Sequence, residues 1–179
     1  MALSKITNGG VAASGIPSGG IIQVQHTQFT GTNSVAITGQ TDTVLTDLTV
    51  NITPTSTSSV IHVQAHIFGE HSDDNSTSWN HVFFFYRDTT KLENGSPGNR
   101  TSGISVATRT IDTVNDDSTA QVARYDYFDT PSTTSQITYK CGVLTFASET
   151  FFLNRTVTDG DGVGYERGVS FISATEIAG

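Results

Sequence analysis

The chain has 179 residues and a mass of 19.0 kDa, the size of one domain, and 57 of its residues are Thr, Val or Ile, which favour strands over helices. Only five Glu, three Lys, six Leu and one Met are present, so a helical bundle or a Rossmann-type sheet is a poor candidate. The net charge of −8 and the scattered Lys and Arg argue against nucleic-acid binding. The chain has no apolar run long enough to span a membrane, and the single Cys141 excludes an intrachain disulfide.

The first twenty residues, MALSKITNGGVAASGIPSGG, are rich in Gly, Ala and Ser and show no sustained period of 2 or 3.6. We expect residues 1–20 to form an extended N-terminal arm and residues 21–179 to form the folded domain. Four spaced apolar residues of the arm can lie in grooves of a neighbouring protein and partly add strand-like hydrogen bonds. These predicted anchors are Leu3, Ile6, Val11 and Ile16.

From Ile21 onward, short β-rich runs alternate with clusters of Gly, Asn, Asp, Ser and Pro. This pattern is typical of an all-β sandwich or barrel. We therefore predict an antiparallel β-sandwich, jelly-roll-like, with strands near residues 21–29, 34–38, 43–53, 60–68, 80–87, 104–113, 120–129, 136–147, 150–155 and 168–177.

Two of these runs differ in their patterning. Residues 60–68 alternate apolar and polar side chains, which predicts a half-buried strand. In the run HVFFFYR at 81–87, Phe83 and Phe85 lie on the strand face opposite to Val82 and Phe84, so both faces are apolar. A two-layer sandwich covers only one face of each sheet, so this second aromatic row predicts a partner subunit or a covering loop. Phe83 and Phe85 are accordingly the predicted interface of an oligomer.

Five histidines, at positions 26, 62, 66, 71 and 81, raise the question of a metal site. His62 and His66 share a strand face but lie about 13 Å apart at about 3.3 Å per residue, too far for one ion with bonds of about 2.1 Å. A ring of histidines from several copies on a symmetry axis stays open beside the simpler interpretation of a polar strand face.

Acidic residues gather in three predicted loops, at 73–74, at 116–117 and in the DGDG run with Asp159 and Asp161. Calcium prefers such oxygen-rich loops. The segment DGDGVGYERGVS nevertheless fails the EF-hand pattern, because Val163 and Ser170 occupy ligand positions. Turn chemistry explains Asp and Gly equally well. We expect no cofactor, and calcium in these loops remains an open alternative.

The sequence contains no GxSxG, HExxH, Walker A or GxGxxG motif, and Cys141 lies in an apparent strand, so we expect no enzymatic activity. The loop HSDDNSTSWN at 71–80 places one Trp among hydrogen-bonding side chains, the combination that a saccharide requires. Asp73, Asp74 and Trp79 are the candidate receptor contacts. Alternatively, Trp79 packs at the rim of the core.

Several strings together resemble the small virion proteins of tailed bacteriophages, particularly marine and cyanobacterial phages. These strings are MALSKITNGGV at the start, GGIIQVQ at 19–25, DTPSTTSQITYK at 129–140, LNR at 153–155 and RGVSFISATEIAG at 167–179. The likeness covers nearly the whole chain, except that residues 71–119 match nothing recognisable. It implies a fibre-tip, knob or decoration module with a short arm and a jelly-roll-like sandwich, commonly trimeric.

The resemblance and the residue patterns together predict a non-enzymatic structural protein of a phage particle, located in the virion. We expect a homotrimer that is held to other virion proteins by its arm and displays loops, with a host surface glycan as a possible ligand. The alternative is a soluble carbohydrate-binding module, and a minor third candidate is a polysaccharide hydrolase.

Overall fold

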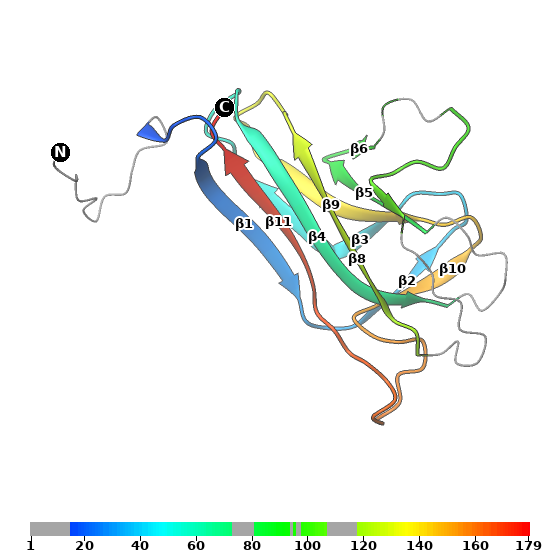
Figure 1. Ribbon diagram of the computed structural model, residues 1–179. Helices are drawn as coiled ribbons and strands as arrows, with labels where there is room; N and C mark the ends of the chain where they lie inside the picture. Colours follow the sequence, from blue (N-terminus) through cyan, green and yellow to red (C-terminus); the bar gives the residue numbers. More distant parts are fainter. Residues whose placement is uncertain (1–14, 73–80, 94, 96–97, 107–117) are drawn as a thin grey trace.

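The computed structural model describes residues 15–72, 81–93, 95, 98–106 and 118–179, which form two antiparallel sheets packed face to face (Figure 1). The first sheet contains β1 (Ile21–Phe29), β2 (Asn33–Ile37), β4 (Val60–His71), β8 (Gln121–Asp129), β10 (Glu149–Leu153) and β11 (Ser170–Ile177). The second contains β3 (Thr43–Ile52), β5 (Val82–Arg87), β6 (Thr90–Leu92), β7 (Ser105–Val106) and β9 (Ile137–Leu144). The predicted all-β, jelly-roll-like antiparallel sandwich is confirmed.

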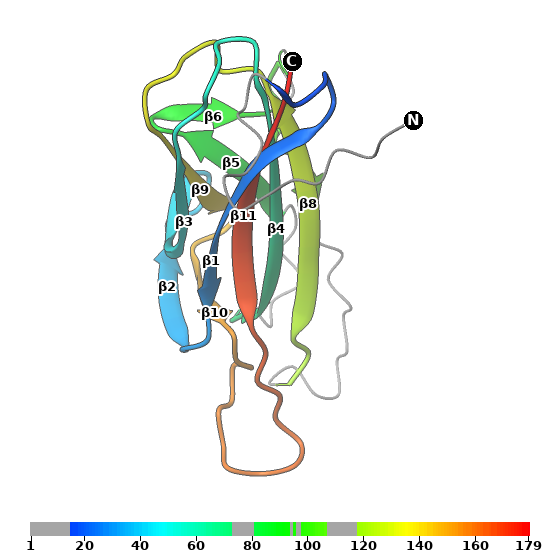
Figure 2. The same ribbon diagram turned by 90° about the vertical axis from the view of Figure 1, so that its left-hand side faces the viewer.

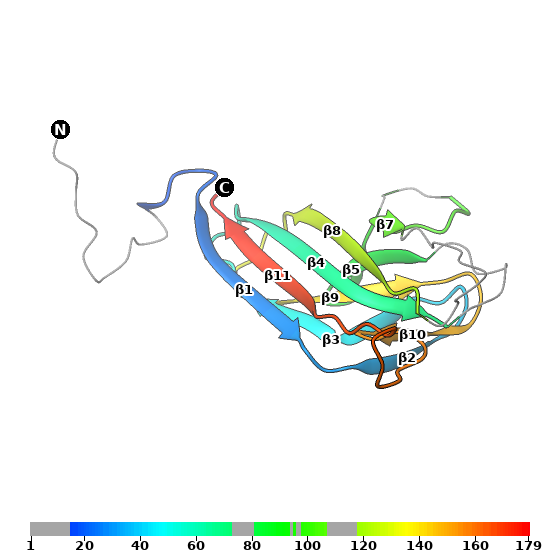
Figure 3. The same cartoon turned by 60° about the horizontal axis from the view of Figure 1, so that its bottom comes forward.

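Strand β4 organises the first sheet. The strand order is β1-β11-β4-β10-β2. β11 pairs with the first part of β4 and β10 with its last residues, so both lie along one edge of β4, and β8 pairs along the opposite edge. The second sheet runs β3-β9-β5-β6, with β7 also paired to β5. Figure 3 shows β1, β11, β4 and β8 lying over β3 and β9. Within the described residues, no helix has the length and apolar character of a membrane span.

Most predicted strands are present, with shifted ends. Strand β4 continues to His71, three residues beyond the predicted end, and β9 stops at Leu144. Of the strand predicted at 104–113, β7 covers Ser105–Val106, and residues 107–113 lie outside the described part. The three-residue β6 was not predicted, because so short a strand exists only through its pairing with β5.

The core lies between the sheets and consists of aliphatic and aromatic side chains from both. The alternation predicted in β4 is confirmed, since Ile61, Val63 and Ile67 are fully buried while Gln64 is exposed. Hydrophobic side chains that leave water in this way provide the main driving force for folding.

The prediction that Phe83 and Phe85 form an oligomer interface is not supported by their positions. Phe83 is 1% exposed and Phe85 0% exposed, and both belong to the core between the two sheets of a single chain. The pattern correctly indicated two apolar faces on this strand but assigned the wrong face to the core. A side chain buried inside its own sandwich has no surface to offer to a second copy.

The outer face of β5 is also covered, by the same chain. Phe84 is fully buried, with the Lys91 ammonium 4.2 Å from its ring centre and the Tyr86 ring edge-on at 5.5 Å. Gly142 of β9 lies under the Phe84 ring, where a Cβ atom would come within 2.3 Å of it. Side chains and backbone of the neighbouring strands of the same chain therefore cover Phe84, and this burial needs no partner subunit.

The molecule has two distinct ends, as Figure 2 shows. At one end, β1 begins beside the end of β11, and backbone hydrogen bonds run from Gly19 N to the Ala178 carbonyl and from Ala178 N to the Gly20 carbonyl, both 2.8 Å. At the other end, the connection from β10 to β11, residues 154–169, extends beyond the sheets.

Buried carboxylates fasten loops to the sandwich. Glu176, which has no exposed surface, accepts hydrogen bonds from Thr55, Ser59 and Gln23 at the end where the termini lie. At the opposite end, Glu70 accepts hydrogen bonds from the backbone of Thr119 and Val157. Each carboxylate thereby holds segments that are distant in sequence.

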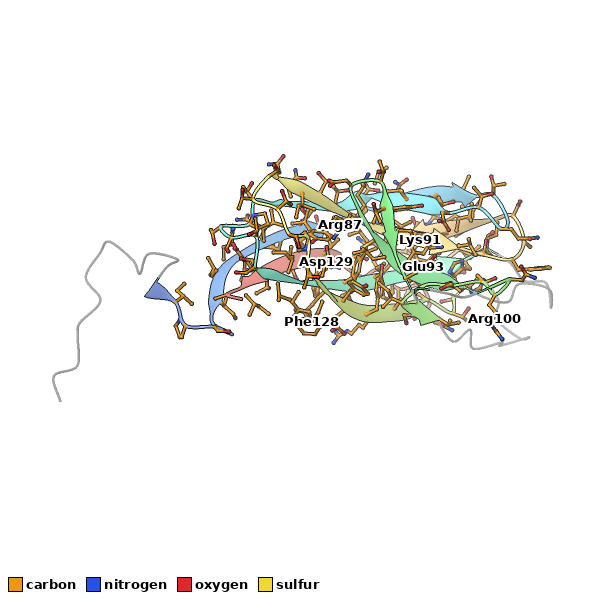
Figure 4. All side chains as sticks on the ribbon, turned by 90° about the horizontal axis from the view of Figure 1, so that it is seen from above. Arg87, Lys91, Glu93, Arg100, Phe128 and Asp129 are labelled. Carbon is orange, nitrogen blue, oxygen red and sulfur yellow. The ribbon has the colours of Figure 1, made fainter. Side chains whose placement is uncertain are left out.

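A third buried carboxylate joins the two sheets. Asp129 at the end of β8 accepts a hydrogen bond from Arg87 at 2.8 Å, and Figure 4 labels both residues. It accepts a second one from the Tyr139 hydroxyl at 2.6 Å. Burial first, and then the hydrogen bond to Asp129, raise the pKa of Tyr139 well above its usual range. The Tyr139 hydroxyl therefore stays protonated and serves as a donor that links β9 to β8.

Candidate functional site

Three groups capable of binding a metal ion meet at the end of the sandwich away from the termini. His71 is the last residue of β4, His81 immediately precedes β5, and Glu149 opens β10. The pairing of Phe151 with His71 across β10 and β4 brings Glu149 beside the end of β4. The cluster therefore joins the first sheet to the second.

One carboxylate oxygen is the centre of this cluster. His71 Nδ1 lies 2.7 Å from Glu149 Oε1, and His81 Nε2 lies 3.3 Å from the same oxygen. The two imidazole rings are stacked, with centroids 3.7 Å apart and planes 7° from parallel. The three ligating atoms lie within 4.8 Å of one another.

The cluster is shielded from solvent. The side chains of Glu149, His81 and His71 are 1%, 3% and 10% exposed. Burial alone would raise the pKa of Glu149, but the hydrogen bond with His71 and the close approach of the His81 ring lower it to about 2. Glu149 is thus an anion at neutral pH, held by two nitrogen-bearing rings.

A small cavity of about 30 Å³ adjoins the cluster. Its wall contains polar groups from His71, His81, Glu70, Thr119 and Gln121, and apolar groups complete the lining with Ile67, Gly69, Phe83, Ala123 and Phe151. A polar cavity needs about 10–15 Å³ to hold one water molecule, so this one has room for a water or an ion beside the two rings.

This site was not predicted from the sequence. The five histidines suggested a metal set, but strand spacing gives a distance only for His62 and His66, which share one strand. His71 and His81 are ten residues apart, and Glu149 follows 68 residues later, so only the folded chain brings them together. The spacing of the two histidines around a predicted loop between two strands was the available signal.

A second notable surface is the outer face of the first sheet, formed by β1, β11, β4 and β8. We call it the aromatic face, and its exposed apolar side chains are Val24, Val122, Phe128 and Phe171. His62 stacks on Phe128 with ring centroids 4.1 Å apart, and His66 stacks on Phe171 at 5.5 Å. The register explains both stacks, because His62 pairs with Phe128 and His66 with Phe171 across neighbouring strands.

Polar groups complete this aromatic face. His62 hydrogen-bonds to Asp126 at 3.0 Å, and Arg124 donates to His66 Nδ1 at 2.8 Å. Burial and the Arg124 charge lower the pKa of His66, so this ring is neutral at pH 7. A hollow of about 250 Å³ lies between Phe171, His66, Arg124 and Asp126. The face thus combines stacked rings with hydrogen-bonding groups.

The other predicted site residues have mixed outcomes. Asp73, Asp74 and Trp79 lie outside the described residues, as do Leu3, Ile6 and Val11. Ile16 is half-buried and lines a hollow of about 350 Å³ with Ile22, Thr55, Ser56, Ser58, Ser59, Ala178 and Gly179.

The acidic loop with Asp159 is explained without calcium. Both Asp159 oxygens accept hydrogen bonds from Arg167, at 2.7 and 2.8 Å, and Arg155 lies 3.7 Å away. An aspartate that is already neutralised by two guanidinium groups is a poor calcium ligand. Its role in the structure is to close the loop.

Cys141 is buried in β9, as its position in a strand predicted. Burial raises the pKa of its thiol to about 12. Cys141 is therefore a protonated thiol at neutral pH, whereas a nucleophilic cysteine requires the thiolate.

Comparisons with known proteins give a limited result. No model of a known protein family matches the chain, and no curated protein matches its sequence. Among solved structures, the VP2 subviral particle of infectious bursal disease virus resembles it with a TM-score of 0.41 at 12% identity, over 99% of this chain and 46% of that one. The Gx strain of the same virus gives 0.37 at 12% identity, over 99% and 47%. The chain thus spans less than half the length of either neighbour.

Proposed function

We propose that this chain is a non-enzymatic structural protein of a virus particle, of the fibre, knob or decoration type found in tailed phages. The observation that carries the proposal is the division of the sandwich into two ends (Figures 1 and 2). Both termini leave the fold at one end, and the long connection from β10 to β11 extends from the other. A module anchored at one end and displayed at the other needs this arrangement.

The anchoring end fits an arm that docks on a neighbour. The arm leaves through Gly19 and Gly20, whose backbone is tied to Ala178 by two hydrogen bonds, so a pull on the arm acts directly on the paired strands β1 and β11. Leu3, Ile6, Val11 and Ile16 are its proposed contacts with other virion proteins. An arm that becomes ordered only on docking loses backbone entropy, which costs about 1–2 kcal/mol of free energy per residue. Apolar contacts with the neighbouring protein have to offset this cost.

We place self-association on the aromatic face. Its exposed side chains Phe128 (60%) and Phe171 (39%) are apolar, and the neighbouring Arg124 and Asp126 supply charges of opposite sign that can pair between copies. Closed cyclic assembly buries such surfaces, and the resemblance to phage virion proteins favours a homotrimer.

Light scattering coupled to size exclusion tests the assembly. We expect a trimer for the unaltered chain and a folded monomer for Phe128→Asp, with Phe146→Asp as a matched control because Phe146 is 50% exposed but lies in a turn. A monomer for the unaltered chain at micromolar concentration contradicts the trimer.

A mass-spectrometric inventory of purified particles tests the virion assignment itself. Recovery of this chain in stoichiometric amounts supports it. Absence of the chain from particles, while it is abundant in the same lysate, rejects it.

A soluble carbohydrate-binding module is the second candidate, favoured by one observation. The stacked His66 and Phe171 line a hollow of about 250 Å³ together with Arg124 and Asp126, so the aromatic face offers a ring surface beside hydrogen-bonding groups. Glycan-array binding that is lost in Phe171→Ala favours this candidate, and the particle inventory separates it from the virion role.

A further inference from the structure

We propose that His71, His81 and Glu149 form a site for a divalent transition-metal ion of the zinc type. Two imidazole nitrogens and one carboxylate oxygen are a ligand set that zinc accepts, with a fourth position left for water. The alkaline-earth ions prefer all-oxygen sets, so Mg²⁺ and Ca²⁺ do not fit.

The distances support an ion at this place. For tetrahedral bonds of about 2.1 Å, neighbouring ligand atoms lie about 3.4 Å apart. His81 Nε2 is 3.3 Å and His71 Nδ1 is 2.7 Å from Glu149 Oε1. One ligating atom from each of the three residues lies within 4.8 Å of the other two. An ion would lie between these atoms, and shifts of well under 1 Å bring the two contacts to the Glu149 oxygen to the required lengths.

One ring has to turn when the ion binds. A metal ion lies near the plane of each imidazole that ligates it, whereas the two rings are stacked 3.7 Å apart and nearly parallel. His71 is held in β4, whereas His81 precedes β5, so we assign the turn to His81. The cavity of about 30 Å³ beside both rings offers space next to the moving ring.

The ion would act as a clamp between the two sheets. His71 and Glu149 belong to the first sheet, and His81 leads into β5 of the second. The two histidines also bound residues 72–80, which contain the candidate receptor contacts Asp73, Asp74 and Trp79. Binding would therefore fix both ends of this connection and stabilise the folded chain, by an amount that grows with the logarithm of the free zinc concentration once this exceeds the dissociation constant.

Isothermal titration of the full chain, stripped with EDTA and then titrated with ZnCl₂ at pH 7.5, tests the proposal. We expect one ion per chain, with protons released on binding and a rise in melting temperature. Glu149→Gln and His81→Gln should each weaken zinc binding by more than about tenfold. The controls His26→Gln and His62→Gln alter histidines outside the cluster and should bind like the unaltered chain, while MgCl₂ and CaCl₂ should leave the melting temperature unchanged.

Several results overturn the site. They are the absence of saturable zinc binding, binding that survives in Glu149→Gln and His81→Gln, and binding that His62→Gln abolishes. If the cluster variants do not fold, the visible absorption of Co²⁺ on the unaltered chain decides. The strong bands of a four-coordinate ion that zinc displaces support the site, and the weak bands of a six-coordinate ion on the surface contradict it.

Discussion

Phe85 and Phe146 are the same residue type in opposite surroundings. Phe85 has no exposed surface and packs on Tyr125, with ring centroids 4.5 Å apart, whereas Phe146 is 50% exposed in a turn after β9. The cost of removing an aromatic ring depends on the cavity that it leaves behind.

We expect Phe85→Ala to lower the free energy of unfolding by about 3–5 kcal/mol and Phe146→Ala to lower it by less than about 1 kcal/mol. Urea denaturation followed by circular dichroism measures both. If Phe85→Ala instead left stability intact and dissociated an oligomer, the ring would lie at an interface and not in the core.

The ionisation of Glu176 makes the stability of the fold depend on pH. Burial alone would raise the pKa of Glu176, but hydrogen bonds from Ser59, Gln23 and Thr55 lower it below its usual value of 4.5. A carboxyl group whose pKa is lower in the folded state stabilises the fold above its unfolded pKa, and this contribution is lost as the pH falls through the folded value.

We expect Glu176→Gln to unfold more easily than the unaltered chain at pH 7, by about 2–3 kcal/mol, because charged hydrogen bonds are lost. The difference should narrow as the pH falls below about 4.5, since protonation removes the same charge from the unaltered chain. Urea titrations at pH 7, 5 and 3 measure this, with the exposed Glu166→Gln as control. A gap that is constant with pH contradicts the assigned role.

At the scale of elements, two sets of contacts hold the connection between β10 and β11, one at its first residue and one farther along the loop. Asn154, the first residue, is fully buried, and its amide donates to the carbonyls of Phe29 and Gly31. Farther along the loop, Asp159 binds Arg167 and lies near Arg155. Arg167 is 61% exposed, so this ion pair adds little to global stability.

Asp159→Asn should therefore change the melting temperature little but loosen the loop. We expect faster cleavage by trypsin after Arg155 and Arg167, with Asp161→Asn as control because Asp161 is exposed nearby. Calcium should not protect either chain. Protection of the unaltered chain by calcium, lost in Asp159→Asn, would restore the calcium interpretation of this loop.

At the scale of the whole molecule, the arm and the sandwich should be separable. Backbone hydrogen bonds of Gly19 and Gly20 with Ala178 tie the described N-terminal segment to the residue that follows β11. Of the described residues before Gly19, which are 15–18, Ile16 is half-buried and the other three are exposed.

A chain that starts at Gly19 should fold with a melting temperature within about 2 °C of the full chain and should fail to join particles. A chain that starts at Val24 loses the first pairs between β1 and β11 and should be clearly less stable. Calorimetry measures the folding, and co-sedimentation with particles measures the incorporation. Normal incorporation of the chain that starts at Gly19 rejects the arm as the anchor.

The sequence by itself determined the fold class and most strand positions. β-branched residues and period-2 alternation act locally, so the strand Ile21–Phe29 and the buried face of β4 could be predicted from neighbouring residues alone. The burial of Cys141 followed from the same local pattern.

Only the tertiary structure decided which faces are covered and which distant groups meet. Strand β5 lies between β9 and β6 in the second sheet, with Phe83 and Phe85 on the face that meets the first sheet. On the other face, Lys91 covers the ring of Phe84. His71, His81 and Glu149 meet because β10 pairs with the last residues of β4, which no local pattern encodes. Strand pairing between distant segments depends on the packing of the whole chain, so the candidate site became visible only in the folded molecule.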